Sequence, residues 1–225
     1  MKSKVLVFDL DDTLFPERDF VYSGFRAVAQ YMAQQHDIAD FDKRAIALFE
    51  GGERQRVFNR CLDGLGIDAD AAYIEELIHL YRNHKPNIQL PAESAHVLSA
   101  LRGCKRLAII TDGYLQTQRN KIQALALDRY VEYIVYTDEL GRAHWKPSAT
   151  GYRQVQHFFQ VEGRHCLYVA DNPHKDFVTA RRLSWMTVRL RCEGREHAAR
   201  EPERGYEADV EIGALNEILL LPEVL

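Results

Sequence analysis

Near its start the chain reads Val5-Leu6-Val7-Phe8-Asp9-Leu10-Asp11-Asp12-Thr13-Leu14. The apolar run at residues 5–8 is typical of a strand that is buried on both faces, as in a parallel sheet. Ligands bind beyond the carboxyl ends of such strands, which is where Asp9 and Asp11 are expected to lie. Carboxylates crowded at one strand end repel each other unless a cation shares the site, and Mg²⁺ fits ligands that are all oxygens. The alternative is an acidic turn in which Asp12 caps the following helix.

The composition is that of an ordinary soluble globular protein, with 46% hydrophobic and 28% charged residues among 225. A formal net charge of -4 argues against binding to a nucleic-acid polymer, which needs a basic surface. No stretch is long and apolar enough for a membrane span or a signal segment, so no membrane partner is expected. The four cysteines lack metal-ligand spacing, and Cys104 and Cys166 adjoin apolar runs that predict buried thiols. A cytoplasmic location is the resulting prediction.

Residues 15–86 show apolar side chains at helical spacing and no strand pattern. About four short helices are expected there, inserted between the first strand and the rest of a sheet. The predicted organisation is therefore a core domain formed by residues 1–14 and 87–225 and an inserted helical domain formed by residues 15–86.

From residue 91 onward, helical and strand patterns alternate. Helices are expected near residues 93–101, 115–125, 149–159 and 175–183, and strands near 106–110, 133–136, 166–169 and 185–190. This alternation predicts an α/β fold with a Rossmann-like parallel sheet. The tail adds a short apolar piece at 208–210 and a final helix at 215–220, after a polar stretch, 191–205, that is expected to be a mobile loop.

Reactive side chains also follow other predicted strands. The tripeptide Thr111-Asp112-Gly113 offers a hydroxyl and accessible backbone N–H groups, which suit a phosphate oxygen, although a simple turn would explain it too. Lys146 precedes Pro147, which restricts the backbone before it, and a lysine fixed in this way can neutralise an anionic substrate.

The last strand end of this kind contains two aspartates five positions apart. Asp171 directly follows the strand at 166–169 and Ala170, and it is a candidate metal ligand. Asp176, in the next turn, could orient Lys146 or a metal-bound water. The alternative is that one aspartate caps a helix and the other is exposed.

These four motifs, in this order and each after its own strand, resemble those of the haloacid dehalogenase (HAD) superfamily of aspartate-nucleophile phosphatases. The resemblance covers essentially the whole chain and implies that residues 15–86 are a helical cap of the C1 type. One departure is Ala170, where the family commonly has glycine.

The resemblance implies a role for each motif residue. Asp9 would be the nucleophile that forms an aspartyl-phosphate, and Asp11 would be the general acid and base. The presence of Asp11 favours phosphate esters over carbon–halogen bonds, because a leaving halide needs no proton. The Mg²⁺ ligands would be Asp9, the backbone carbonyl of Asp11, and Asp171. The phosphate-binding groups would be Lys146, Thr111 and the backbone N–H groups near Asp112 and Gly113.

The substrate is expected to be a small phosphorylated metabolite, either a nucleotide or a sugar phosphate. The opening motif is loosely similar to that of pyrimidine 5′-nucleotidase-like members. The candidate substrate contacts in the cap are Phe15, Arg18, Tyr22, Phe25, Arg54 and Arg56. Tyr22 and Phe25 fit the core of the cap equally well. A phosphomutase or a non-catalytic binding or regulatory protein on the same scaffold are the alternatives, and the sequence leaves the oligomeric state open.

Overall fold

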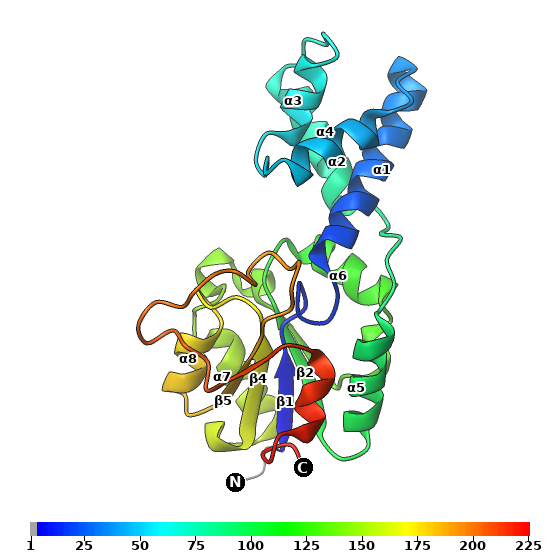
Figure 1. The fold of residues 1–225 in the computed structure, drawn as a ribbon. Coiled ribbons are helices and arrows are strands. Elements are labelled where there is room, and N and C mark those ends of the chain that lie inside the picture. Colours follow the sequence, from blue (N-terminus) through cyan, green and yellow to red (C-terminus); the bar gives the residue numbers. More distant parts are fainter. Residues whose placement is uncertain (1–3) are drawn as a thin grey trace.

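The computed structural model describes residues 4–225, so residues 1–3 of the predicted core lie outside the described part. Its centre is one sheet in which every neighbouring pair of strands is parallel, in the order β3-β2-β1-β4-β5-β6 (Figure 1). The strands are β1 (Val5–Phe8), β2 (Arg106–Thr111), β3 (Tyr133–Tyr136), β4 (Cys166–Ala170), β5 (Met186–Leu190) and β6 (Val210–Ile212). The predicted α/β class with a parallel sheet is confirmed.

The helices alternate with the strands from α5 onward. The α-helices are α1 (Glu17–His36), α2 (Phe41–Glu50), α3 (Val57–Asp63), α4 (Ala71–Asn83), α5 (Ala92–Arg102), α6 (Leu115–Ala124), α7 (Thr150–Phe159) and α8 (Phe177–Arg182). The 3₁₀ turns are η1 (Leu127–Arg129), η2 (Thr137–Leu140), η3 (Arg142–His144), η4 (Gly163–His165) and η5 (Leu215–Leu220). The last of these is the predicted final helix at 215–220, and it is a 3₁₀ helix. None of the helices in the described part is both long and apolar enough to cross a membrane.

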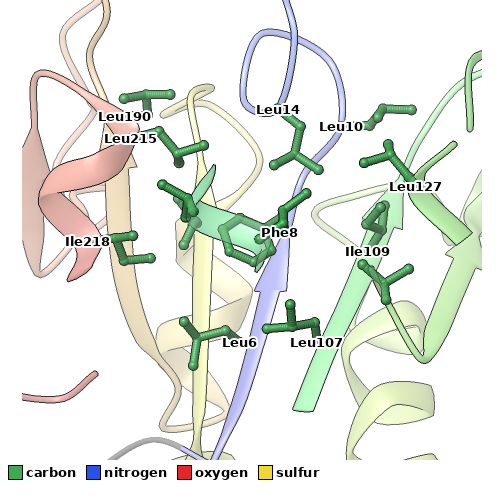
Figure 2. Packing of buried hydrophobic residues seen from close by; sticks show 14 of the residues in the cluster. Leu6, Phe8, Leu10, Leu14, Leu107, Ile109, Leu127, Leu190, Leu215 and Ile218 are labelled. Carbon is green, nitrogen blue, oxygen red and sulfur yellow. The ribbon is translucent and has the colours of Figure 1, made fainter. Parts of the chain in front are cut away.

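The sheet is covered on both faces because successive side chains of a strand point to opposite sides. On β1, Leu6 and Phe8 enter a cluster with residues of α5, α6 and η5 (Figure 2). Val5 and Val7 enter a second cluster with residues of α7 and α8. All four residues of β1 are fully buried, which is the burial expected of a central parallel strand.

Helices α1–α4 lie beyond the carboxyl end of β1 and build a cluster of their own (Figure 1). Val28 and Met32 of α1 and Phe41 and Ala45 of α2 are among its buried members. Phe25 belongs to the same cluster and is almost fully buried. Of the two interpretations that the sequence left open for Phe25, the structure therefore supports packing in the core of these helices. These helices therefore have an apolar core separate from the two that flank the sheet.

Gly163, at the start of η4, lies against the end of α8. A Cβ atom at this position would come within 1.8 Å of the carbonyl oxygen of Leu183, which is a backbone atom and cannot rotate away. We therefore expect Gly163→Ala to lower the free energy of unfolding by about 3 kcal/mol in denaturant titrations. The matched control is Gly103→Ala, where no atom lies within 4 Å and φ is -78°, and there no loss is expected. Equal stabilities of the two variants would contradict the close approach.

Candidate active site

The order of strands reverses at β1, because β2 and β3 lie on one side of it and β4, β5 and β6 on the other. The carboxyl edge at such a switch point is where open α/β sheets bind ligands. Asp9 follows β1 there, and its backbone N–H donates to the carbonyl of Val169 on β4 at 2.9 Å. Asp112 follows β2 and Asp171 follows β4. The register of the three strands thus brings these predicted residues to one edge.

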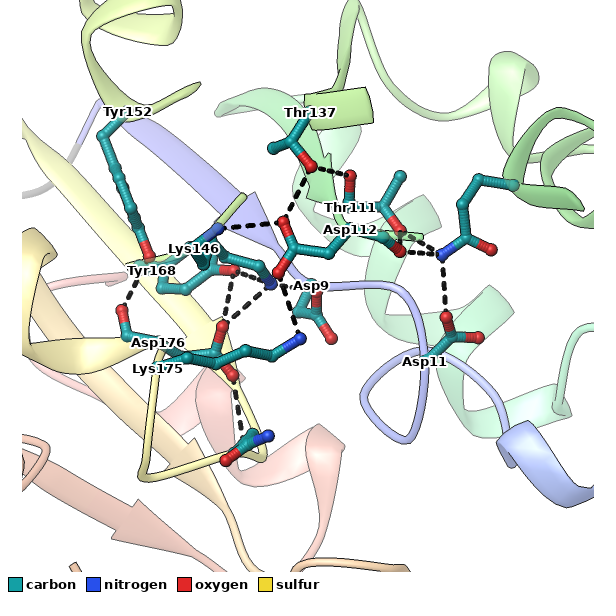
Figure 3. A network of polar contacts seen from close by, with 12 residues as sticks. Asp9, Asp11, Thr111, Asp112, Thr137, Lys146, Tyr152, Tyr168, Lys175 and Asp176 are labelled. Atoms are coloured by element: carbon teal, nitrogen blue, oxygen red, sulfur yellow. Dashed lines mark hydrogen bonds and ion pairs between the residues drawn. The ribbon is translucent and has the colours of Figure 1, made fainter. Parts of the chain in front are cut away.

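Lys146 lies between two of the carboxylates. Its ammonium group contacts the Asp9 carboxylate, lies 2.8 Å from Asp176 Oδ1 and donates to the hydroxyl of Tyr168 at 2.9 Å (Figure 3). Burial alone would lower the pKa of Lys146, but Asp176 and Asp9 outweigh it and hold the pKa above its usual value. Lys146 is therefore a buried cation fixed against the side chain that the sequence singled out as the nucleophile.

Three carboxyl groups lie close enough together to hold a metal ion. Ligand atoms of Asp9, Asp171 and Asp176 are all within 4.8 Å of one another. Burial, with the charges of Asp9 and Asp176, raises the pKa of Asp171 to about 9, and burial raises that of Asp9 to about 7. Asp171 Oδ2 is buried and has no hydrogen-bond partner among the described residues. A buried acceptor without a partner beside two other carboxyl groups fits a hard divalent cation.

The side chain of Asp112 organises the loops around the site. Its carboxylate accepts hydrogen bonds from Thr137 Oγ1 at 2.8 Å and the backbone N–H of Lys146 at 3.1 Å, and pairs with Lys175 Nζ at 3.1 Å. Burial acts to raise the pKa of Asp112, but the charges of Lys146 and Lys175 and the hydrogen bond from Thr137 bring it below its usual value. Asp112 thus connects the loops that follow β2 and β3 with Lys175, which precedes α8.

The other two members of the tripeptide lie differently. Thr111 is buried, and its hydroxyl accepts a hydrogen bond from Gln118 Nε2 at 2.7 Å, so it is turned toward α6. Gly113 adopts a φ of +117°, a backbone conformation that favours glycine.

Asp12 is a contact point for residues 191–205, the polar stretch that the sequence placed only as a loop. Its carboxylate accepts from the backbone N–H of Glu196 at 3.1 Å and lies 3.4 Å from the guanidinium of Arg195. The buried Arg189 of β5 donates to the carbonyls of His197 and Arg200 and holds the same loop. Residues 191–205 therefore lie against the turn that follows β1.

Two cavities meet above the strand ends. One, of about 230 Å³, is lined by the predicted residues and by further side chains. Its lining includes Asp9, Asp11, Asp112, Gly113, Lys146 and Asp171, together with Trp145, Asn172, Lys175 and His197. The second, of about 520 Å³, shares Asp12 and Glu17 with the first and reaches between α1, α2 and the loop that contains Arg195. Arg18 and Arg54, two of the predicted cap contacts, line the second cavity.

Sequence reasoning missed four groups that contact the site residues, namely Tyr168, Lys175, Gln118 and Lys121. It also missed His197, which lines the cavity. Tyr168 lies inside a strand and Gln118 and Lys121 inside a helix, where each fits an ordinary structural pattern. Lys175 directly precedes Asp176 within the last motif, and this position was the one feature of the sequence that could have indicated its place in the site.

The family comparison agrees with the motifs. Residues 3–183 match the family described as haloacid dehalogenase-like hydrolases. Glyceraldehyde 3-phosphate phosphatase of Pyrococcus abyssi is 28% identical over 192 residues, which cover 82% of this chain and 80% of the relative. Phosphoserine phosphatase of Thermus thermophilus is 29% identical over 181 residues, which cover 78% of this chain and 68% of the relative.

Solved structures share the fold. A HAD hydrolase of Bacillus subtilis, YfnB, solved with bound magnesium, has a TM-score of 0.69 at 18% identity, covering 98% of each chain. A HAD phosphatase of Thermococcus onnurineus has a TM-score of 0.62 at 21% identity, covering 100% of this chain and 99% of the other. Because residues 3–183 match this family, the chain belongs to the haloacid dehalogenase-like hydrolases, as its four motifs predicted.

Proposed function

We propose that this chain is a Mg²⁺-dependent phosphatase that hydrolyses phosphomonoesters of small metabolites through an aspartyl-phosphate on Asp9. The observation that carries the proposal is the contact of the Asp9 carboxylate with the buried Lys146 at the edge of the 230 Å³ cavity, with Asp171 beside it. The relatives named as phosphatases support the same reaction.

Asp9 is proposed as the nucleophile. One of its carboxylate oxygens bonds to phosphorus while the bond from phosphorus to the ester oxygen breaks, and the leaving oxygen takes that electron pair. Asp11, which lines the same cavity, gives its proton to that oxygen. In the second half of the reaction Asp11 takes a proton from the water that hydrolyses the aspartyl-phosphate, which restores both side chains.

The phosphate oxygens need positive charge and N–H donors, because the transferring group spreads negative charge over them. Lys146 and Lys175 supply two ammonium groups at the cavity wall, and the backbone of Gly113 lines the same cavity. Thr111 is a weaker candidate for a direct contact than the sequence indicated, since its buried hydroxyl is held by Gln118.

Asp9, Asp171 and the backbone carbonyl of Asp11 are the proposed Mg²⁺ ligands, and Asp176 orients Lys146 through its 2.8 Å ion pair. When bound, the ion supplies positive charge that offsets the repulsion between a carboxylate nucleophile and a phosphate anion. Asp171 Oδ2, which is buried without a hydrogen-bond partner among the described residues, would gain such a partner.

Helices α1–α4 are proposed to act as a cap over the phosphate. The 520 Å³ cavity between them and the core is large enough for the rest of a small ester, and its walls carry both charged and aromatic side chains. The relatives are named for glyceraldehyde 3-phosphate and phosphoserine, which extends the proposed substrate class from nucleotides and sugar phosphates to three-carbon esters.

The proposal is tested by phosphate release from a panel of monoesters in the presence of Mg²⁺ or of EDTA. The panel contains glyceraldehyde 3-phosphate, phosphoserine, hexose phosphates and nucleoside monophosphates. We expect release that requires Mg²⁺ and falls at least about 10³-fold in EDTA, because the ion supplies several kcal/mol to the transition state. A folded protein that releases phosphate from none of these esters would contradict the proposed function, and transfer of the phosphoryl group within a sugar instead of release would indicate a mutase.

A further inference from the structure

The carboxylate of Asp11 is held by two side chains of α6. Lys121 Nζ lies 2.7 Å from Asp11 Oδ1, and Gln118 Nε2 donates to Asp11 Oδ2 at 2.8 Å. Figure 3 shows Asp11 apart from the cluster around Lys146. Both oxygens of Asp11 are thus engaged by side chains of α6, and the direction in which Asp11 faces the cavity depends on this helix.

The spacing of the two residues explains how one helix reaches both oxygens. Gln118 and Lys121 are three positions apart and therefore lie on one face of α6. Gln118 is 1% exposed and Lys121 is 3% exposed, whereas Asp11 remains partly accessible from the cavity. Two buried donors on a rigid helix leave the carboxylate little rotational freedom.

The surroundings of Lys121 are unusual for a lysine. Its ammonium lies 4.5 Å from the centre of the Phe20 ring and 3.7 Å from Glu17 Oε1. Lysine is almost never fully buried unless it is paired, and a buried ion pair contributes little net stability because both charges lose water. The cost of burying this lysine therefore points to a role in orienting its partner.

We propose that Lys121, assisted by Gln118, is the positioning residue that fixes the Asp11 carboxyl group for proton transfer to the leaving oxygen. This inference rests on the proposed function. Lys121 itself exchanges no proton and touches no substrate atom; it acts by holding Asp11 in the direction that meets the ester oxygen as its bond to phosphorus breaks. Gln118 links the same carboxylate to Thr111, whose hydroxyl it also contacts at 2.7 Å.

The test compares Lys121→Met with the wild type on two esters that differ in their need for a proton. p-Nitrophenolate leaves as a stable anion, whereas the alcohol of glycerol 3-phosphate must be protonated as it leaves. Release of the leaving group in the first turnover is followed by rapid quench, which separates this step from hydrolysis of the aspartyl-phosphate. We expect release from glycerol 3-phosphate to slow about 100-fold and release from p-nitrophenyl phosphate to slow less than about threefold.

Two further variants control the comparison. Thr117→Val is on the same helix, removes a 2.9 Å hydrogen bond to the carbonyl of Arg82 and does not touch Asp11, so the ratio of the two rates is expected to stay at the wild-type value. Lys121→Gln keeps an N–H donor near Asp11, and we expect it to recover part of the loss; it also provides the test if Lys121→Met does not fold.

The outcomes separate the two proposals. An equal loss on both esters in folded Lys121 variants would assign Lys121 a structural role and overturn the inference. A wild type that releases neither p-nitrophenol nor glycerol, and no phosphate from any ester of the panel above, would instead contradict the proposed function. A selective loss on the alkyl ester, with p-nitrophenyl phosphate spared, supports the positioning role.

Discussion

Asp9→Asn is expected to abolish phosphate release, with kcat/KM falling by at least about 10⁴-fold for every ester that the wild type accepts. An amide oxygen is a poor nucleophile toward phosphorus, so no covalent intermediate forms. The measurement is phosphate release at saturating Mg²⁺, together with acid quenching of the enzyme after incubation with an ester labelled in its phosphoryl group. We expect the labelled phosphoryl group to be bound to the wild type and not to the variant.

The same substitution is expected to leave the fold intact. Asparagine has nearly the shape of aspartate, and Lys146 keeps the ion pair with Asp176 at 2.8 Å and the hydrogen bond to Tyr168 at 2.9 Å. Asp63→Asn changes an exposed carboxylate at the end of α3 and should leave activity unchanged. Retention of more than about one hundredth of the activity by folded Asp9→Asn would exclude Asp9 as the nucleophile.

The positions of Asp9, Asp112 and Asp171 could be predicted from the strands that they directly follow. Because residues 5–8 are uniformly apolar and β-forming, they could be recognised as a central parallel strand, and Asp9 then had to lie at its carboxyl end. Asp112 and Asp171 were placed by the same reasoning applied to β2 and β4. Local sequence was sufficient because each residue directly follows the strand that positions it.

The side chains and loops that hold these site residues in place could not be predicted in the same way. Lys121 is 110 positions from Asp11, and its helix reads as an ordinary amphipathic segment. The loop that contains Arg195 and His197 reads as polar and solvent-exposed, yet Asp12 and Arg189 hold it at the cavity. Such contacts depend on how separate elements pack. The residue pattern within one element does not indicate which distant residue it will contact.

Chain ends and turns were also predicted less well than central strands. The apolar piece expected at residues 208–210 corresponds to the short edge strand β6, which begins two residues later. Cys166 is buried as expected, but the expectation for Cys104 is wrong, because it lies exposed in the turn between α5 and β2. Adjacency to an apolar strand does not bury a residue that precedes the strand.

Asp171→Asn is expected to have opposite effects on activity and on the stability of the metal-free protein. Asp171 is buried beside Asp9 and Asp176, and its Oδ2 lacks a partner among the described residues. An amide there can donate to a neighbouring carboxylate, so in EDTA the free energy of unfolding should rise by about 1 kcal/mol. Phosphate release should fall about 10³-fold, because an anionic ligand of the ion is lost.

Titration of Mg²⁺ during thermal unfolding distinguishes a ligand from a merely crowded carboxylate. Added Mg²⁺ should stabilise the wild type by about 2.7 kcal/mol at one hundred times the dissociation constant, because the ion binds the folded state and not the unfolded chain. Asp171→Asn should lose most of this stabilisation, whereas the exposed-site control Asp63→Asn should keep it. If Mg²⁺ stabilised Asp171→Asn as much as the wild type, Asp171 would not be a ligand, and its burial without a partner would then be a pure cost to folding. We therefore expect Asp171→Asn to be less active in Mg²⁺ and more stable than the wild type in EDTA. This combination is expected if the function of the Asp171 carboxylate is to bind a cation.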